Sequence, residues 1–282
     1  MIIVADSGST KCHWLIFNNS KKTILECNTI GFNPFFVDQK TILAHLEESA
    51  LVEYKNDIKK IFFYGAGCSS KEQNTIIENA LKIFFSNAVI NVKHDIEGAC
   101  YSVYNGNKNI TCILGTGSNS CLYDGEKITE YAPALGFILG DEASGNYFGK
   151  KILSYYFNKK LPQELRETLK ADFETDLSKI KHNTYNKSRA NKFLASFFPF
   201  IINNKNHPFI KKLINSVLSE FFSLHIQCYE NHKNIEINFI GSVAYYLKEE
   251  IQNIAAQKKL NIGNIIQHPI YNLMDFHLKN EK

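Results

Sequence analysis

The chain opens with two short apolar runs that flank a polar turn. Ile2 to Ala5 is apolar enough for a buried strand, and a second apolar run follows from His13 to Phe17. Asp6 and the turn Ser7-Gly8-Ser9-Thr10-Lys11 lie between them, so the stretch predicts a β-hairpin. Small residues let backbone N–H groups approach an anion, and a lysine adds positive charge. The turn is therefore either a phosphate loop or an ordinary polar hairpin turn. It is not a P-loop, because the GxxxxGK(S/T) pattern is absent.

The second half of the chain opens in the same way. Ile110 to Leu114 predicts an apolar strand, the segment from Gly115 to Ser120 a small polar turn, and Cys121 to Tyr123 a second strand. A third strand is expected at Lys127 to Tyr131, as it is at Lys22 to Ile30 in the first half. The repeat is one of architecture and not of sequence. Two such turns from two similar halves would face each other across a cleft, which favours the phosphate interpretation.

Helices and strands alternate in the remaining segments, which predicts an α/β protein. In the first half we expect helices over 38–52, 71–85 and 96–104 and strands over 59–64 and 89–92, with a turn at 105–107 as the boundary between halves. In the second half, Asp141 is expected to cap a helix that continues to Phe157. Further expected elements are mostly helical stretches over 162–202 and 207–230, strands over 235–240 and 262–266, a helix over 243–258 and a terminal helix from Pro269.

Composition excludes several classes of protein. The chain has 282 residues, enough for one large domain or two of ordinary size. A net charge of +4 is too small and too dispersed for a nucleic-acid-binding protein. The N-terminus lacks the pattern of a signal peptide, and no apolar run approaches the ~20 residues of a membrane helix. We therefore expect a cytoplasmic protein with no membrane partner.

The seven cysteines are scattered, and no CxxC pair occurs. Most lie inside apolar runs, as Cys112 does, so buried reduced thiols are predicted and a metal or iron–sulfur site within one chain is not. The cysteines are Cys12, Cys27, Cys68, Cys100, Cys112, Cys121 and Cys228.

Five motifs occur in order along the chain: DSGST, HDIEGA, LGTGSNS, LGFILGDEASG and FIGSVA. In combination they resemble the BadF/BadG/BcrA/BcrD ATPase-like family, and within it the N-acetylglucosamine kinases. The resemblance covers nearly the whole chain. It implies the actin/Hsp70/hexokinase fold, with two ribonuclease-H-like lobes and a nucleotide and sugar cleft between them. The N-terminal lobe would comprise residues 1–105 with the terminal helix 268–282, and the C-terminal lobe residues 106–267.

The resemblance implies that the protein uses ATP and Mg²⁺. Asp6 would hold the Mg²⁺ through water, and two loops and an adenosine segment would hold the nucleotide. Two positions depart from the family pattern, which usually has a second glycine where Ser242 stands and a glycine where Asn272 stands. The residues matched to the nucleotide are Gly8, Ser9, Thr10, Lys11, Gly115, Thr116, Gly117, Gly241, Ser242 and Ala244.

Asp95 matches the catalytic base, which would accept the proton of a sugar hydroxyl as it attacks the γ-phosphate. From the residues alone, Asp95 is also a candidate helix N-cap, Asn33 a turn former beside Pro34, and Asp141 a helix cap. Glu142 is expected to support Asp141, and His94 to be structural. The residues matched to the sugar are Asn33, Ser118, Asn119, Gly136 and Asp141.

The leading interpretation is an ATP-dependent kinase that converts N-acetylglucosamine to its 6-phosphate. Glucosamine and N-acetylmuramic acid are alternative substrates, because the sequence does not reveal the shape of the sugar loop. A dehydratase activator of the same fold needs cysteines that share an iron–sulfur cluster, and that pattern is not evident. A nucleotide-binding protein without catalysis is disfavoured by the presence of Asp6 and Asp95. The resemblance is compatible with a homodimer.

Overall fold

The structure is a computed structural model that describes residues 1–280. The chain divides into two compact units. Unit 1 comprises Met1–Gly106 together with the residues from His268 onward, and unit 2 comprises Asn107–Gln267. Each unit is built on its own five-stranded sheet.

The sheet of unit 1 has the strand order β3-β2-β1-β4-β5. The first three strands form an antiparallel meander, and β1, β4 and β5 are parallel to one another. The central strand β1 reads as a continuous apolar run because both of its faces are covered, as is typical of strands buried on both sides. The strands are β1 (Ile2–Ser7), β2 (Lys11–Phe17), β3 (Thr23–Ile30), β4 (Lys60–Gly65) and β5 (Val89–His94).

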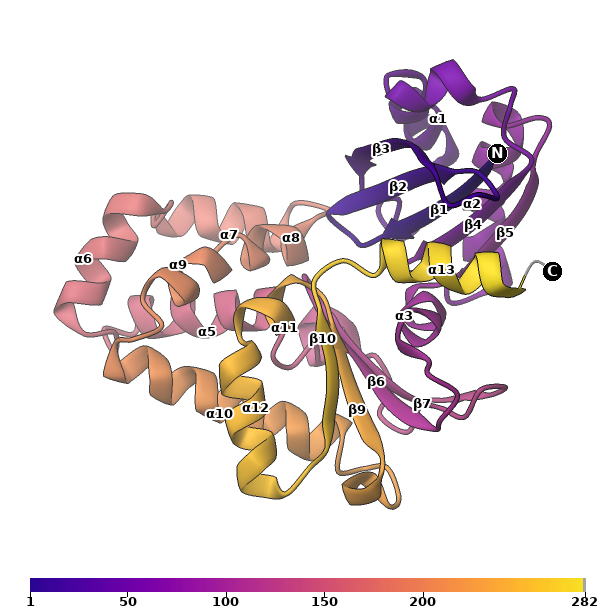
Figure 1. Ribbon diagram of the computed structural model, residues 1–282. Helices are drawn as coiled ribbons and strands as arrows, with labels where there is room; N and C mark the ends of the chain where they lie inside the picture. The colour runs from indigo at the N-terminus through magenta and orange to yellow at the C-terminus, as the bar shows by residue number, and fades with distance from the viewer. Residues whose placement is uncertain (281–282) are drawn as a thin grey trace. The chain divides into compact units, whose positions relative to one another are not determined.

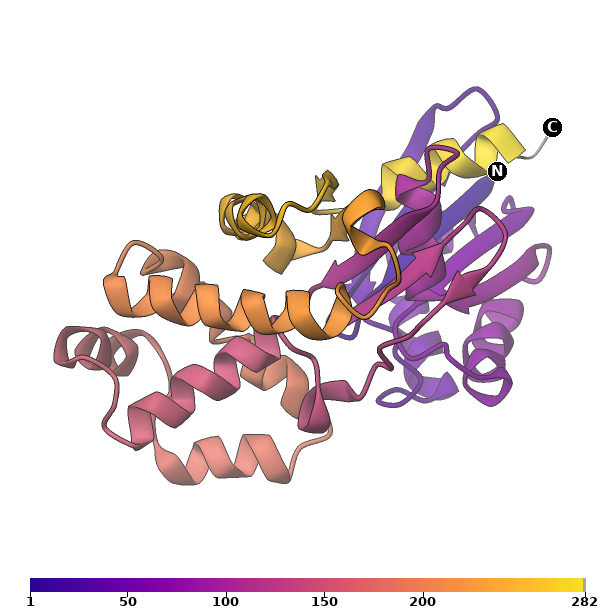
Figure 2. The same cartoon turned by 90° about the horizontal axis from the view of Figure 1, so that it is seen from below.

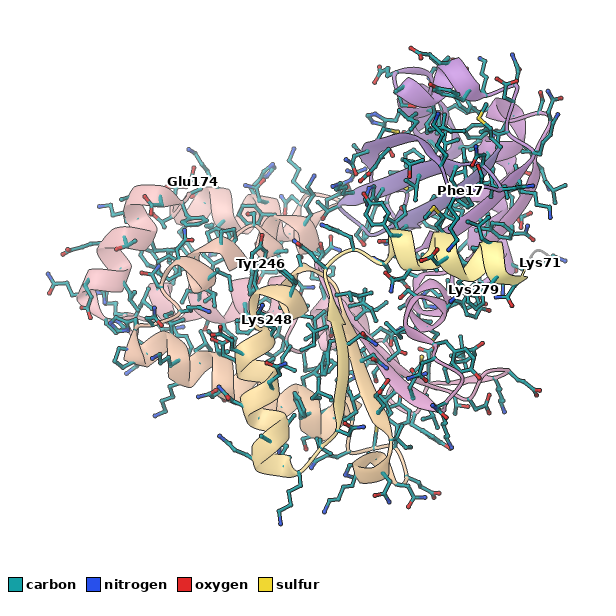
Figure 3. All side chains as sticks on the ribbon, in the orientation of Figure 1. Phe17, Lys71, Glu174, Tyr246, Lys248 and Lys279 are labelled. Carbon is teal, nitrogen blue, oxygen red and sulfur yellow. The ribbon has the colours of Figure 1, made fainter. Side chains whose placement is uncertain are left out.

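Helices cover both faces of this sheet (Figure 1). One face packs against α1 (Gln39–Glu47) and α2 (Lys71–Phe84), with Trp14 and Phe63 in the core between them. The other face packs against α3 (Asp95–Val103) and α13 (Ile270–Asn280). The second face has its own small apolar cluster, in which Ile270 and Leu273 of α13 cover Ile2, Val4, Leu15 and Phe17; Phe17 is labelled in Figure 3.

Unit 2 repeats the same sheet, with the order β10-β9-β6-β7-β8. The first three strands along the chain, β6, β7 and β8, again form an antiparallel meander, and β6, β9 and β10 are parallel to one another. The predicted repeat of architecture is therefore confirmed at the level of strand order. The strands are β6 (Asn109–Leu114), β7 (Ser118–Tyr123), β8 (Ile128–Thr129), β9 (Glu236–Ile240) and β10 (Ile262–Ile266).

A group of helices between β8 and β9 gives unit 2 most of its core, which includes Phe197, Phe200, Phe221 and Phe222. Figures 1 and 2 show α5 to α10 gathered on one side of the strands of this unit. The helices between β8 and β9 are α4 (Gly136–Leu139), α5 (Gly145–Phe157), α6 (Gln163–Asp172), α7 (Leu177–Tyr185), α8 (Ala190–Ala195), α9 (Phe198–Asn203) and α10 (Pro208–His225). Two more helices, α11 (Ser242–Tyr246) and α12 (Lys248–Lys258), follow β9.

Several predicted elements differ from the structure, and three of them illustrate the differences. The helix expected over 38–52 ends at Glu47 and is followed by a separate 3₁₀ turn, η1 (Ala50–Tyr54), capped by Ser49. The strand expected over 127–131 is only two residues long. The helix expected over 243–258 is divided into α11 and α12 at the buried Leu247.

All seven cysteines are free thiols, and five of them are buried. Cys27 is half-buried, and Cys228 is exposed, so the prediction of buried thiols is wrong for Cys228. Among residues 1–280 no helix has the length and apolar character needed to cross a membrane.

Candidate active site

The first polar turn is closed by a hydrogen bond in which the Gly8 N–H donates to the Lys11 carbonyl over 3.0 Å. The turn lies against Gly31, whose N–H donates to the Thr10 carbonyl over 3.1 Å. A Cβ atom at Gly31 would lie 2.1 Å from the carbonyl oxygen of Gly8, so only glycine fits here. The shape of the turn therefore depends on a residue some twenty positions away, which the sequence analysis did not identify.

Asp6 ends the central strand of unit 1 next to this turn. Its neighbours in register are His13 on β2 and Tyr64 on β4. Burial and the nearby charge of Asp95 raise the pKa of Asp6 to about 7, against an opposing contribution from Lys11. A cation is favoured where carboxylates are crowded and poorly solvated, and Mg²⁺ prefers oxygen ligands, often one or two carboxylates with water and phosphate. The donor set at Asp6 therefore fits Mg²⁺, although among residues 1–280 no three His, Cys, Asp or Glu side chains form a complete metal-binding group.

Asp95 is the first residue of α3, directly after β5. The N-cap of the helix is His94, which makes no capping hydrogen bond, so the alternative interpretation of Asp95 as the cap is wrong. The Asp95 side chain is 21% exposed, and its Oδ1 lies 3.2 Å from Nε2 of His94. Burial raises the pKa of Asp95 above the usual carboxyl range, and the charge of His94 opposes that shift.

Asn33 lies in the loop after β3 and is buried. Its Nδ2 donates to the Ser9 hydroxyl over 2.9 Å, and its Oδ1 accepts from the N–H of Phe35 over 3.0 Å. The second bond is the turn-forming role that the sequence allowed. The first bond joins this loop to the first polar turn. Asn33 and Ser9, two residues that the sequence predicts for the site, therefore lie together in unit 1.

In unit 2 the second polar turn is held by its carbonyl groups. The Gly115 N–H donates to the Gly117 carbonyl over 2.9 Å, which closes the turn. The Gly115 carbonyl accepts from the N–H of Gly145 over 2.8 Å, and the Thr116 carbonyl accepts from Asn146. The beginning of α5 is thus bonded to the turn.

Asp141 lies beside the same turn. Its Oδ1 accepts from the N–H of Ser118 over 3.2 Å, and its Oδ2 accepts from Nδ2 of Asn146 over 2.6 Å. Asp141 does not cap the helix, because Ser144 is the N-cap of α5 and accepts from the N–H of Tyr147. Burial raises the pKa of Asp141, and its hydrogen bonds with Asn146 and Ser118 oppose the shift.

Two further residues matched to the sugar begin β7. The Ser118 hydroxyl is buried and has no hydrogen-bond partner among the described residues. The Asn119 side chain accepts from the N–H of Ser120 over 2.7 Å and donates to Glu130 over 3.4 Å. A buried hydroxyl without a partner is a group that a ligand can satisfy.

Gly136 and Glu142 lie apart from these contacts. Gly136 is exposed, adopts a φ of +71° and begins the short helix α4. Glu142 does not support Asp141 as expected, because its Oε2 pairs with Nε2 of the buried His225 on α10 over 2.9 Å.

The segment matched to adenosine lies between β9 and α11. Gly241 has a φ of +114°, and a Cβ atom there would lie 2.4 Å from the carbonyl oxygen of Leu114. Ser242 is the exposed first residue of α11, and Ala244 is buried within it. This segment therefore packs directly against the end of β6, where the second polar turn begins.

Comparison with solved structures shows a full-length relative. The chain is 32% identical to the Putative N-acetylglucosamine Kinase from Porphyromonas gingivalis, with 100% of each chain covered and a TM-score of 0.92. The Putative N-acetylglucosamine Kinase from Chromobacterium violaceum matches at 14% identity over 98% of each chain, with a TM-score of 0.72. A ROK family glucokinase from Streptomyces griseus, solved with glucose and AMPPNP, matches at 11% identity over 97% of this chain and 98% of its own, with a TM-score of 0.57. The last two show the fold alone. No protein-family model and no curated protein matches the chain.

The paired five-stranded sheets and the turns at their strand ends define the actin-like ATPase fold, in the form that sugar kinases share. The chain belongs to the same family as the Porphyromonas gingivalis protein.

Proposed function

We propose that this protein is an ATP-dependent kinase of amino sugars and that it phosphorylates N-acetylglucosamine at its 6-hydroxyl. The observation that carries the proposal is the 32% identity over the full length of the Porphyromonas gingivalis protein, whose name assigns it that substrate. The order of the five motifs supports it, and is the basis for proposing membership of the BadF/BadG/BcrA/BcrD group.

Asp95 is the proposed general base. A carboxylate that accepts a proton from an alcohol works best when its pKa lies nearer to neutrality than that of a free carboxylate. The partial burial of Asp95 raises its pKa in that direction. Its position at the start of a helix holds the group in a fixed place, which orients the attacking hydroxyl.

The two polar turns are proposed to bind the phosphates of ATP. In the unit 2 turn, the carbonyls of Gly115 and Thr116 accept hydrogen bonds from the beginning of α5, which fixes the orientation of this small, glycine-containing turn. Lys11 is exposed and supplies a positive charge at the unit 1 turn. Gly241, Ser242 and Ala244 are proposed to contact the adenosine.

Asp6 is proposed to hold Mg²⁺. When bound, the ion neutralises charge on the transferring phosphoryl group. Asp6 itself contributes a carboxylate whose ionised form is disfavoured without a cation, because of burial and the charge of Asp95.

The sugar is proposed to contact Asn33, Ser118, Asn119, Gly136 and Asp141. Sugar hydroxyls require paired donors and acceptors, which amide, hydroxyl and carboxylate side chains provide. The unpartnered hydroxyl of Ser118 and the carboxylate of Asp141, which is already oriented by two donors, support this assignment.

A coupled assay of ADP release tests the proposal. The purified protein is supplied with Mg·ATP and, separately, N-acetylglucosamine, glucosamine, N-acetylmuramic acid and glucose. We expect turnover to be fastest with N-acetylglucosamine, and a 6-phosphate product identified by NMR. Turnover with only glucosamine or only N-acetylmuramic acid would assign that sugar as the substrate in place of N-acetylglucosamine. The absence of sugar-dependent ADP release with all four sugars would refute the assignment as a kinase of these sugars.

A further inference from the structure

We propose that Asn146 is a positioning residue that couples nucleotide binding to sugar binding. The inference rests on the proposed function, because it takes the turn at 115–117 as a phosphate loop and Asp141 as a sugar contact.

The side-chain amide of Asn146 bridges these two features. Its Nδ2 donates to the carbonyl of Thr116 over 2.7 Å and to Oδ2 of Asp141 over 2.6 Å. An amide NH₂ group has two hydrogens, so both are used. The backbone N–H of Asn146 also donates to the Thr116 carbonyl, over 3.2 Å. Because the residue is fully buried, water does not compete for these bonds.

A second bond links the same two features. Oδ1 of Asp141 accepts from the N–H of Ser118, the residue that follows the turn. The turn and the carboxylate are therefore joined on both sides of Asp141. A shift of the Thr116 carbonyl moves the Asn146 amide, and with it one of the two donors that orient Asp141.

The backbone around Asp141 depends on such contacts. Asp141 and Ala143 have φ angles of +60° and +59°, in the left-handed region, which aspartate adopts more readily than most residues but alanine adopts only when its surroundings enforce it. A phosphate bound at the turn and a sugar bound at Asp141 thus favour one arrangement of the same loop. Each ligand then binds more tightly when the other is present, because the coupling of two sites is reciprocal.

Substitution of Asn146 by aspartate tests the coupling between the two ligand sites while keeping the size and shape of the side chain nearly unchanged. Asp has nearly the size of Asn but has no donor at that position, and its carboxylate would face the Thr116 carbonyl and the Asp141 carboxylate. Asn146→Ser is a second variant, because a hydroxyl has one hydrogen and cannot bridge both acceptors. Asn109→Asp is the matched control. Asn109 is a buried amide at the opposite end of β6, where it donates to the carbonyl of Asn107 over 3.2 Å.

The experiment measures, by calorimetry, the affinity of a non-hydrolysable ATP analogue with Mg²⁺, in the absence and presence of saturating N-acetylglucosamine. For the wild-type protein we expect the sugar to tighten analogue binding by about 5-fold or more. For Asn146→Asp and Asn146→Ser we expect a factor close to one, and for Asn109→Asp the wild-type factor. The reciprocal titration, sugar with and without analogue, must give the same factors.

The outcomes separate the two proposals. A wild-type protein that turns over no sugar refutes the proposed function, and this inference with it. If the wild-type protein is a kinase but sugar does not change its affinity for the analogue, only the inference about Asn146 is overturned. The same holds if the Asn146 variants keep the wild-type effect of sugar on analogue affinity. Thermal melting establishes that each variant is folded, and if Asn146→Asp does not fold, Asn146→Ser decides the result.

Discussion

The carboxylates of Asp6 and Asp95 lie close enough in unit 1 for the charge of Asp95 to raise the pKa of Asp6. The relationship follows from the sheet, because β1, β4 and β5 are parallel and end at the same edge. In register, Ser7, Gly65 and His94 form one row across these strands, and the two carboxylates flank that row. The fold therefore places two carboxyl groups near each other in partly buried surroundings.

Asp95→Asn is expected to lower turnover by roughly 10²-fold or more, as loss of a general base typically does. Affinity for the ATP analogue should change little, and the melting temperature of the ligand-free protein should stay the same or rise, because a repulsive charge is removed. Steady-state kinetics, calorimetry and thermal melting measure the three effects. Glu97→Gln is the control, since Glu97 lies in the same helix and pairs with Lys93 over 2.8 Å. Turnover like that of the wild type in Asp95→Asn would remove Asp95 from its proposed role.

Asp6→Asn is expected to reduce the effect of Mg²⁺ on nucleotide affinity. Analogue binding measured with Mg²⁺ and with EDTA should differ strongly for the wild-type protein and by much less for the variant, because the neutral amide is a poorer ligand for the ion. Asp38→Asn provides a comparison, since Asp38 is an exposed carboxylate that caps α1 through the N–H of Thr41. An unchanged Mg²⁺ effect in Asp6→Asn would contradict the assignment of Asp6.

Gly31→Ala tests whether the first polar turn binds the nucleotide. The added Cβ would lie 2.1 Å from the Gly8 carbonyl oxygen and 2.8 Å from the backbone nitrogen of Thr10, so the turn must move. We expect analogue affinity to fall at least ~10-fold and the free energy of unfolding to decrease by about 1–3 kcal/mol, the range for overpacked sites. In the control Gly106→Ala, the residue has a φ of +95° but meets no atom within 4 Å. That variant should lose some stability and keep its affinity for the analogue.

His277 makes the stability of unit 1 sensitive to acid. Burial, with a smaller contribution from the charge of Lys93, lowers the pKa of His277 from 6.5 to about 4. Its Nε2 lies 2.8 Å from the hydroxyl oxygen of the buried Tyr64, within hydrogen-bonding distance. The unfolded chain takes up a proton near pH 6.5 but the folded protein only near pH 4. The stabilisation is therefore complete above pH 6.5 and is lost as the pH falls towards 4, by up to ~3 kcal/mol.

Urea denaturation between pH 7 and pH 4.5 measures this effect. His277→Gln keeps a hydrogen-bonding group but cannot take up the proton, so its stability should depend less steeply on pH across this window. His45→Gln, at a side chain that is 37% exposed, is the control and should keep the wild-type slope. Equal slopes for His277→Gln and the wild type would show that another group is responsible.

The sequence predicts the architecture well because its strongest signals are local. Apolar runs broken by glycine and hydroxyl residues identify both hairpins, and α1 and α2 begin directly after Asp38 and Ser70, residue types that favour the N-cap position. Where two residues compete for one role, tertiary contacts decide. Both Asp141 and Ser144 are suitable caps for α5, and Ser144 is used because the Asp141 carboxylate is engaged by Ser118 and Asn146.

Contacts between distant segments are not encoded in local patterns. The close approach of Gly31 to Gly8 and the bridge made by Asn146 become visible only in the folded chain. Neither residue stands out by type, and the only local signal for Asn146 is its position directly after the DEASG segment. The break between α11 and α12 at Leu247 likewise cannot be predicted from the sequence, because no proline or glycine lies near it.

The place of α13 in the chain determines when unit 1 can be completed during synthesis. Unit 2 is one uninterrupted segment, so all of its parts have left the ribosome once residue 267 has emerged. Unit 1 is begun first but still lacks Ile270 and Leu273, which cover Ile2, Val4 and Leu15. Until α13 has been translated, Ile2, Val4 and Leu15 lack that part of their apolar cover, and of the two helices on this face only α3 is present.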